Sequence, residues 1–209
     1  MQIINTETQR WPMSVQDVMA EEQAAGVIIV IGEGYQGHGP YRVVTIREQP
    51  AYDPLAEAVV AQPPAPDEDG RWFQDFAVRL MSAEETASAL QADKGRLQAA
   101  ATAQRWAVET GGVTLPSGTR VGTTVEDQNR ISTVIGNAQL AGITQVDFKA
   151  KSGWVSLSLD DLRGIASAIA QHVQACFSAE RAHHEAIEAV STRAQAEAYD
   201  VTEGWPSGN

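Results

Sequence analysis

Cysteine and lysine are both scarce in this 209-residue chain, and each scarcity argues against a class of protein. Cys176 is the only cysteine, so an internal disulfide is impossible, and no Cys–His cluster is present that would hold a structural zinc. Such usage is typical of a protein that folds in a reducing cytosol. The only lysines are Lys94, Lys149 and Lys151, and the formal net charge is −12. Nucleic acids and anionic membranes attract concentrated positive charge, so we expect neither as a partner.

Long apolar runs are also missing. The longest aliphatic run, residues 27–31, is far too short to cross a bilayer, and the first residues lack the basic start and apolar stretch of a signal peptide. Hydrophobic residues still make up 43% of the chain and charged residues only 20%, which is enough apolar material for a core. The sequence therefore predicts a soluble globular protein.

Residues 1–81 have the pattern of a small, mostly-β N-terminal domain. Ser14 and Asp17 have capping-box spacing, which predicts a short helix that ends near residue 25. The β-branched run at 27–31 predicts a buried strand, and residues 41–47 predict another. A weak strand is expected around 58–60, followed by a proline-rich acidic loop at 62–70. Alternation over 71–81 then predicts one half-buried strand.

Residues 82–110 predict one long helix that connects two domains. Ser82 and Glu85 have capping-box spacing, and the paired glycines at 111–112 end the helical pattern. The apolar seam of this helix includes Leu90 and Leu97 but is thin, which favours a connector or a weak coiled coil over a core helix. Leu90 and Leu97 are therefore candidate partner-binding residues, in a seam that could join copies of the chain.

Residues 111–209 predict a C-terminal α+β domain in the order ββαββα, with helices packed on an antiparallel sheet. A hairpin is expected over 113–121, and a helix capped by Thr124 and ended by Gly142 follows. Strands around 146–148 and 155–159 flank a turn at 151–153, and Ser158 or Asp160 caps a long amphipathic helix. A short helix over 192–199 precedes the tail. The whole chain is thus expected to be α+β.

Several apparent chemical motifs have simpler interpretations. The GEGYQG stretch at 32–37 matches a dinucleotide-binding pattern, but a strand follows it instead of the helix that pyrophosphate binding needs. Glu180 and His183 give one Glu-x-x-His motif, where a di-metal helical site needs two. Cys176 lies on an apolar helix face, as a core thiol does. We expect no enzyme, with no catalytic residue, cofactor or metal ion.

Two tryptophans have unusual positions. Trp154 comes directly after a turn, and Trp205 lies in a Gly-Trp-Pro tail beyond the last helix. A large aromatic residue in a tail either folds back onto its own domain, which we favour, or docks into a partner. Trp154 and Trp205 complete the set of candidate partner-binding residues.

Several short sequence stretches in the second half of the chain are similar to those of a known group of proteins. The stretches are RWAVETGG at 105–112, residues 118–131, KSGWVSLSLDDL at 151–162, and residues 187–190, 199–200 and 204–206. In these stretches, residues 105–206 resemble a phage domain family of unknown function, found C-terminally in bacteriophage tail-fibre assembly-type proteins. Residues 50–54, 69–72 and 82–85 are similar to the companion N-terminal region of such proteins.

The resemblance implies an accessory protein that binds the tail fibre, or another tail protein, and assists its folding, attachment or capping. It transfers no catalytic residues. The expected location is the host cytoplasm during assembly, or the virion tail if the protein is retained there. An alternative is an integral structural subunit of the tail or baseplate that links fibre to tail, with the long helix associating between copies. A third hypothesis is an enzyme or ligand-binding module that uses the glycine loop.

Overall fold

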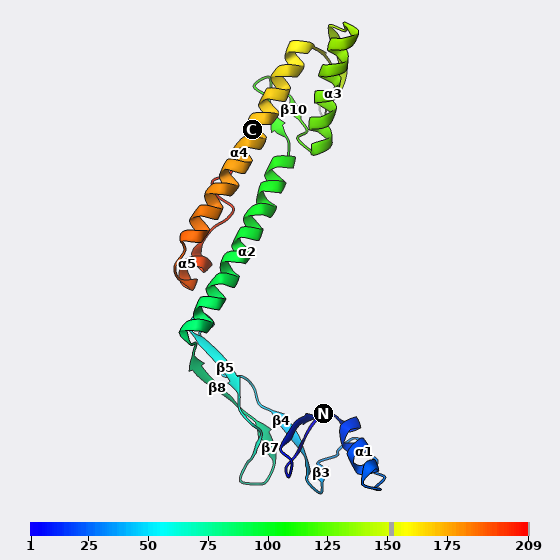
Figure 1. Cartoon of the computed structure of the whole chain (residues 1–209), viewed down its shortest axis with the longest axis vertical. Coiled ribbons are helices and arrows are strands. Elements are labelled where there is room, and N and C mark those ends of the chain that lie inside the picture. The colour runs from blue at the N-terminus through cyan, green and yellow to red at the C-terminus, as the bar shows by residue number, and fades with distance from the viewer. Residues whose placement is uncertain (151–152, 209) are drawn as a thin grey trace. The chain divides into compact units, whose positions relative to one another are not determined.

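The computed structural model describes residues 1–150 and 153–208, and the chain forms two compact units, Met1–Glu84 and Glu85–Asn209. The fold is α+β, as the sequence predicts, with most strands in the first unit and the long helices in the second (Figure 1). This division differs from the expected one. The long helix is not a separate segment over 82–110, because almost all of it belongs to the second unit.

The first unit contains a six-stranded sheet in the order β2-β1-β4-β7-β6, with β3 pairing β4. β4 and β7 pair in parallel, whereas β1 pairs antiparallel with both β2 and β4. A separate antiparallel pair is formed by β5 and β8. The bounds are β1 Gln2–Asn5, β2 Arg10–Met13, β3 Gly37–His38, β4 Tyr41–Ile46, β5 Glu57–Ala61, β6 Ala65–Pro66, β7 Trp72–Gln74 and β8 Phe76–Leu80.

Three sequence predictions for this unit are wrong. The loop expected over 62–70 contains a short strand, β6, which pairs antiparallel with β7. The single strand expected over 71–81 is divided at Asp75, because β7 pairs with β4 while β8 pairs with β5. The run at 27–31 is not a strand of any sheet. Ile29 and Ile31 of this run pack against the core, whereas Ile28 and Val30 are 93% and 91% exposed. The run therefore has the in-and-out alternation of a strand without a neighbouring strand.

The helix α1 (Val15–Ala24) begins as predicted, with the Ser14 and Asp17 side chains in a reciprocal capping box. It packs Val18 against the core cluster of the first unit, which also contains Ile3, Met13 and Tyr41. The Tyr41 hydroxyl donates a hydrogen bond of 3.0 Å to the Glu21 carboxylate on α1. The phenol thus ties the helix to β4 at the centre of the sheet.

The environment of Tyr41 predicts a late titration. Burial, and then the bond to the Glu21 carboxylate, raise the pKa of Tyr41 from 10.0 to about 12. The stability linked to this shift is fully present below pH 10 and is lost as the pH rises through about 12. The phenolate absorbance of the native chain should show a step near pH 12 that a Tyr41→Phe variant lacks. A Tyr41 that titrates at its ordinary pKa would contradict this.

The second unit has the predicted ββαββα order, with α2 before it and α5 after it along the chain. Its elements are α2 Ala83–Thr110, β9 Val113–Thr114, β10 Arg120–Val121, α3 Val125–Ala141, β11 Gln145–Ala150, β12 Gly153–Ser158, α4 Leu159–Ala189 and α5 Arg193–Ala198. The strands form two separate antiparallel pairs, β9 with β10 and β11 with β12, and not the one sheet we expected. The turn predicted at 151–153 lies in part outside the described residues.

Local signals define the helix ends in this unit. Thr124 with Asp127 and Ser158 with Asp161 form capping boxes at the starts of α3 and α4. Gly142 ends α3 in the left-handed conformation, with φ of 67°. α3 packs on α4 through a core cluster that contains Val121, Ile131, Ile165 and Ile169. The described helices include none that is both long and apolar enough to span a membrane.

The apolar seam of α2 is covered within the chain. Leu97 and Ala101 are buried against Ile187 of α4 and Ala196 of α5, and Figure 1 shows α2 running beside α4. Lys94 interrupts the seam, and its ammonium group donates a 2.7 Å hydrogen bond to the Glu188 carbonyl. A thin seam is sufficient here because α4, α5 and the tail cover it together. Leu90 and Leu97, which could have joined copies of the chain, thus pack in a cluster within the chain.

Candidate partner-binding groove

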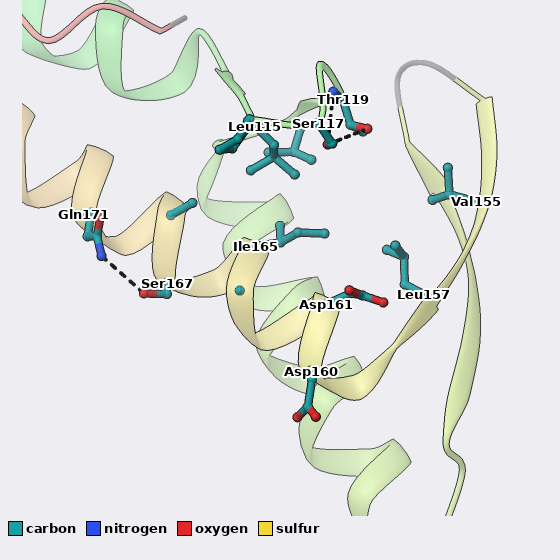
Figure 2. Close-up of a pocket in the computed structure, with 14 residues that line it drawn as sticks. Leu115, Ser117, Thr119, Val155, Leu157, Asp160, Asp161, Ile165, Ser167 and Gln171 are labelled. Carbon is teal, nitrogen blue, oxygen red and sulfur yellow. Dashed lines mark hydrogen bonds between the residues drawn. The ribbon is translucent and has the colours of Figure 1, made fainter.

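An open groove with a volume of about 720 Å³ lies in the second unit, where three segments meet. Its walls are the tip of the β9–β10 hairpin, strand β12 and the first turns of α4 (Figure 2). The hairpin tip is formed by a tight turn in which Gly118 donates its amide hydrogen to the Leu115 carbonyl at 2.8 Å. The groove is lined by Leu115, Pro116, Ser117, Thr119, Val121, Val155, Leu157, Asp160, Asp161, Gly164, Ile165, Ser167, Ala168 and Gln171.

The floor of the groove is apolar. Val155 and Leu157 alternate along β12, so both face the same side of the hairpin. Leu157 and Ile165 point toward one another across the space in Figure 2, and Leu115 closes it from the β9–β10 side. Gly164 and Ala168 stand one helical turn apart on α4, and their small size leaves room above the helix. A Cβ atom added at Gly164 would meet nothing within 4 Å.

The ionisable residues that line the groove are Asp160 and Asp161, both at the start of α4. Asp160 forms an ion pair of 2.9 Å with Arg163. Asp161 accepts hydrogen bonds from the hydroxyl and the backbone N–H of Ser158, at 2.7 and 3.0 Å. These bonds, the side-chain bond first, lower the pKa of Asp161 below its usual 3.8. The groove therefore carries negative charge at one end and apolar surface elsewhere.

This arrangement is suited to holding side chains of another molecule. Apolar walls with a few polar groups at the rim are typical of binding surfaces. Asp161 is occupied as a helix cap and is ionised far below neutral pH, so it is a poor donor of protons. The polar rim residues largely bond one another, with Ser117 donating to Thr119 and Gln171 donating to Ser167.

Three of the four candidate residues from the sequence are used inside the second unit. Leu97 is 4% exposed, and Leu90 and Trp205 pack against the same cluster. Trp205 donates its indole N–H to the Val201 carbonyl at 2.8 Å and stacks on the His183 ring with centroids 4.9 Å apart. The tail thus folds back onto its own unit, which was the alternative we favoured.

Trp154 is the candidate residue that remains open to solvent, with 74% of its surface exposed. It is next to Val155 on β12 and therefore faces the opposite side of the hairpin from the groove. The Lys149 ammonium group lies 5.8 Å from the centre of its ring, which is cation–π distance. Trp154 is available to a partner that wraps the β11–β12 hairpin.

The polar motifs on α4 have structural partners. His183 donates from Nε2 to the Glu203 carbonyl at 2.9 Å and accepts at Nδ1 from the Tyr199 hydroxyl at 2.8 Å. Glu180 pairs with Arg105 of α2, with 2.9 Å between Oε2 and Nε. Arg105 also pairs with Glu109, so one guanidinium group joins two carboxylates between α2 and α4. No group of three or more metal-binding side chains is found across the residues that the structure describes.

The remaining motifs lie apart from the groove. Cys176 is fully buried, and burial raises the pKa of its thiol, as the interpretation as a core residue requires. The glycine stretch at 32–37 leads into β3 and β4 with no helix after it, as its sequence context predicts. Tyr35 and His38 at its end bond each other, with 2.6 Å between the hydroxyl and Nδ1.

The groove could not be predicted from the sequence, because its lining comes from three separated segments. The sequence predicted the strand with the alternating Val155 and Leu157, and also the hairpin around residues 116–118. It did not predict that the two lie next to each other in the fold. The available signal was the pair of small residues Gly164 and Ala168, one turn apart on an otherwise amphipathic helix.

The second unit is therefore an α+β module in which the β9–β10 hairpin, strand β12 and helix α4 form an apolar groove with an acidic end. Residues 92–203 match the family model described as a domain of unknown function (DUF4376), and the match covers more than half of the chain. The protein belongs to this family. The matched residues include α3, both hairpins and α4, and thus the whole groove. No curated protein and no solved structure matches the chain.

Proposed function

We propose that this chain is a non-enzymatic accessory protein of a bacteriophage tail fibre, which binds the fibre to assist its folding, attachment or capping. The observation that carries the proposal is the groove of about 720 Å³, with an apolar floor and two aspartates at one end. Its volume is within the range of sites that bind small molecules or a few side chains, roughly 300–1,000 Å³. The resemblance of residues 105–206 to tail-fibre assembly-type proteins supplies the choice of partner.

The chemistry of fibre assembly suits such a site. Trimeric fibres fold through states with unpaired strand edges and exposed apolar side chains, which aggregate unless they are covered. An apolar groove on a protein of net charge −12 can cover one such segment while the acidic surface keeps the complex in solution. The location that follows is the host cytoplasm during assembly.

The groove gives the proposal a test that leaves the fold intact. Gly164 lines the groove on an exposed face of α4, and its added Cβ would meet open space. A Gly164→Leu substitution should raise the stability of the helix by about 0.5–1 kcal/mol, because glycine is a poor helix former. The same side chain fills the groove. In a pull-down with the fibre protein encoded beside this gene, we expect binding to fall at least about tenfold (about 1.4 kcal/mol).

Gly136 of α3 provides the matched control. It is also an exposed helical glycine with open space at its Cβ position, and it lies outside the groove lining. Gly136→Leu should give a similar gain in stability with unchanged binding to the fibre. Equal binding by both leucine variants would remove the groove from the proposal, and no capture of the fibre protein by the wild-type chain would remove the proposal itself.

The alternative of a structural tail subunit depended on association of the long helix between copies. The Leu90 and Leu97 side chains that would have supplied that seam pack within the chain, so nothing specific now favours this alternative. Mass spectrometry of purified phage particles measures directly whether the protein stays in the virion tail.

A further inference from the structure

The segment at residues 27–31, of sequence VIIVI, is the most exposed aliphatic run in the first unit. Ile28 and Val30 are 93% and 91% exposed, and Val27 is 44% exposed. Ile29 and Ile31, which alternate with them, pack against the core cluster of Ile3, Met13, Val18 and Tyr41. One side of the run is thus anchored on the core, while the other side presents bare β-branched side chains to solvent.

The backbone of this run has no strand beside it. Among the described residues, no strand pairs with 27–31, and the one backbone bond that ties it to α1 runs from the Val27 amide to the Glu22 carbonyl. An uncovered run of this kind is a template for pairing with another chain. A helical ligand would leave these N–H and C=O groups unmatched, whereas an added strand would satisfy them.

Protective residues are absent around the run. Natural proteins guard exposed edges with lysine, proline or inward charges. Here glycines at positions 26 and 32 flank the run, the nearest charged residues are Glu22 and Glu33, and the first unit contains no lysine. The run therefore lacks the residues that discourage pairing with a strand of another chain.

We propose that residues 27–31 are a docking strand for an apolar β-strand of another protein whose ends carry lysine or arginine. The inference rests on the proposed function in that the protein partner, the fibre, is taken from it. The basic ends follow from charge. The first unit has 13 acidic residues and 5 basic ones, a formal charge of −8, so it attracts a cationic segment.

The same charge argues against a second copy of the chain as the occupant. Two first units would each bring a charge of −8 to the contact. A five-residue strand pair is also small beside the roughly 1,200–2,000 Å² that stable protein interfaces bury. A short, apolar and cationic strand from another protein would instead bind weakly and be released, as assembly requires.

The test uses a fluorescent peptide, Lys-Lys-Val-Thr-Ile-Thr-Val-Lys-Lys, titrated with the full chain by fluorescence anisotropy. A peptide with proline in place of the central isoleucine has the same charge but cannot complete a strand pair. We expect saturable binding of the first peptide and at least about tenfold weaker binding of the second. Equal binding of the two peptides, or binding of neither, would overturn the proposal.

A double variant of the chain, Ile28→Ser with Val30→Ser, locates the site without adding charge. Both side chains are almost fully exposed, so the fold should be kept, and circular dichroism checks this. Leu140→Ser on α3 is the matched control, since Leu140 is 88% exposed. The double variant should bind the peptide at least about tenfold more weakly, whereas the Leu140 variant should bind it as the wild type does.

Light scattering and a pull-down with the fibre protein distinguish failure of the docking strand from failure of the proposed function. A wild-type chain that is dimeric in light scattering, together with a monomeric double variant, would make a second copy the occupant and overturn the proposal. If the double variant captures the fibre protein as well as the wild type, the docking strand is wrong while the proposed function stands. If the peptide binds selectively but the wild-type chain does not capture the fibre protein, the docking strand stands and the proposed function fails.

Discussion

Replacing Arg105 with methionine is expected to lower the free energy of unfolding of the second unit by about 3–5 kcal/mol. The Arg105 side chain is 13% exposed, and its two carboxylate partners, Glu109 and Glu180, are 6% and 15% exposed. Its guanidinium group also lies 4.6 Å from the centre of the Phe177 ring. Methionine keeps much of the packing but leaves two carboxylates close together with no cation between them. Calorimetric unfolding of the full chain measures the loss.

Two comparisons make this prediction specific to the buried cluster. Arg181 pairs with Glu185 at 2.7 Å, one helical turn away as Glu109 is from Arg105, but both side chains of this pair are mostly exposed. Arg181→Met should therefore leave the stability of the unit almost unchanged, because an exposed ion pair is screened by solvent. A triple variant that also changes Glu109 to leucine and Glu180 to methionine should regain most of the lost stability, because no buried charge is left in this cluster. An Arg105→Met chain as stable as the wild type would show that the cluster is solvated.

Replacing Leu97 with alanine is expected to lower the free energy of unfolding by about 2–5 kcal/mol without changing the molar mass of the protein in solution. Leu97 is 4% exposed and packs within the chain against Ile187 and Ala196. The substitution leaves a cavity in this cluster, and no contact between copies is lost. Chemical denaturation measures the first effect and static light scattering the second.

Leu140→Ala on α3 is the matched control for this substitution, because Leu140 is 88% exposed. It should change stability by no more than about 0.5 kcal/mol. A fall in particle mass for the Leu97 variant alone would mean that the α2 seam joins copies of the chain, contrary to the packing described above.

Features set by neighbouring residues were predicted well from the sequence. The capping pairs at Ser14, Thr124 and Ser158 and the left-handed Gly142 depend on contacts within four residues, so their positions are readable directly. The hairpin with strands β9 and β10 was predicted for the same reason. Its turn residues lie between two short runs of strand-forming residues.

Features that depend on residues far apart in the sequence were not predicted. The β-branched run at 27–31 was expected to be a buried strand, but propensity cannot tell whether a second strand is present beside it. The strands β1 and β2 went unpredicted because each is four residues long and is held by pairing with β4 or with each other. The groove shares this origin, since Leu115, Leu157 and Ile165 come from three segments.

The way the tail closes the second unit has a consequence for synthesis of the protein on the ribosome. Residues 199–205 supply Tyr199, Val201 and Trp205 to the cluster that covers Leu90 and Leu97, and the Thr114 amide hydrogen bonds to the Gly208 carbonyl. About a hundred residues separate α2 from these partners, which at about 5–20 residues per second is a delay of roughly 5–20 s. During translation the first unit can fold early, while the α2 seam of every nascent chain stays uncovered until α4, α5 and the tail have been made.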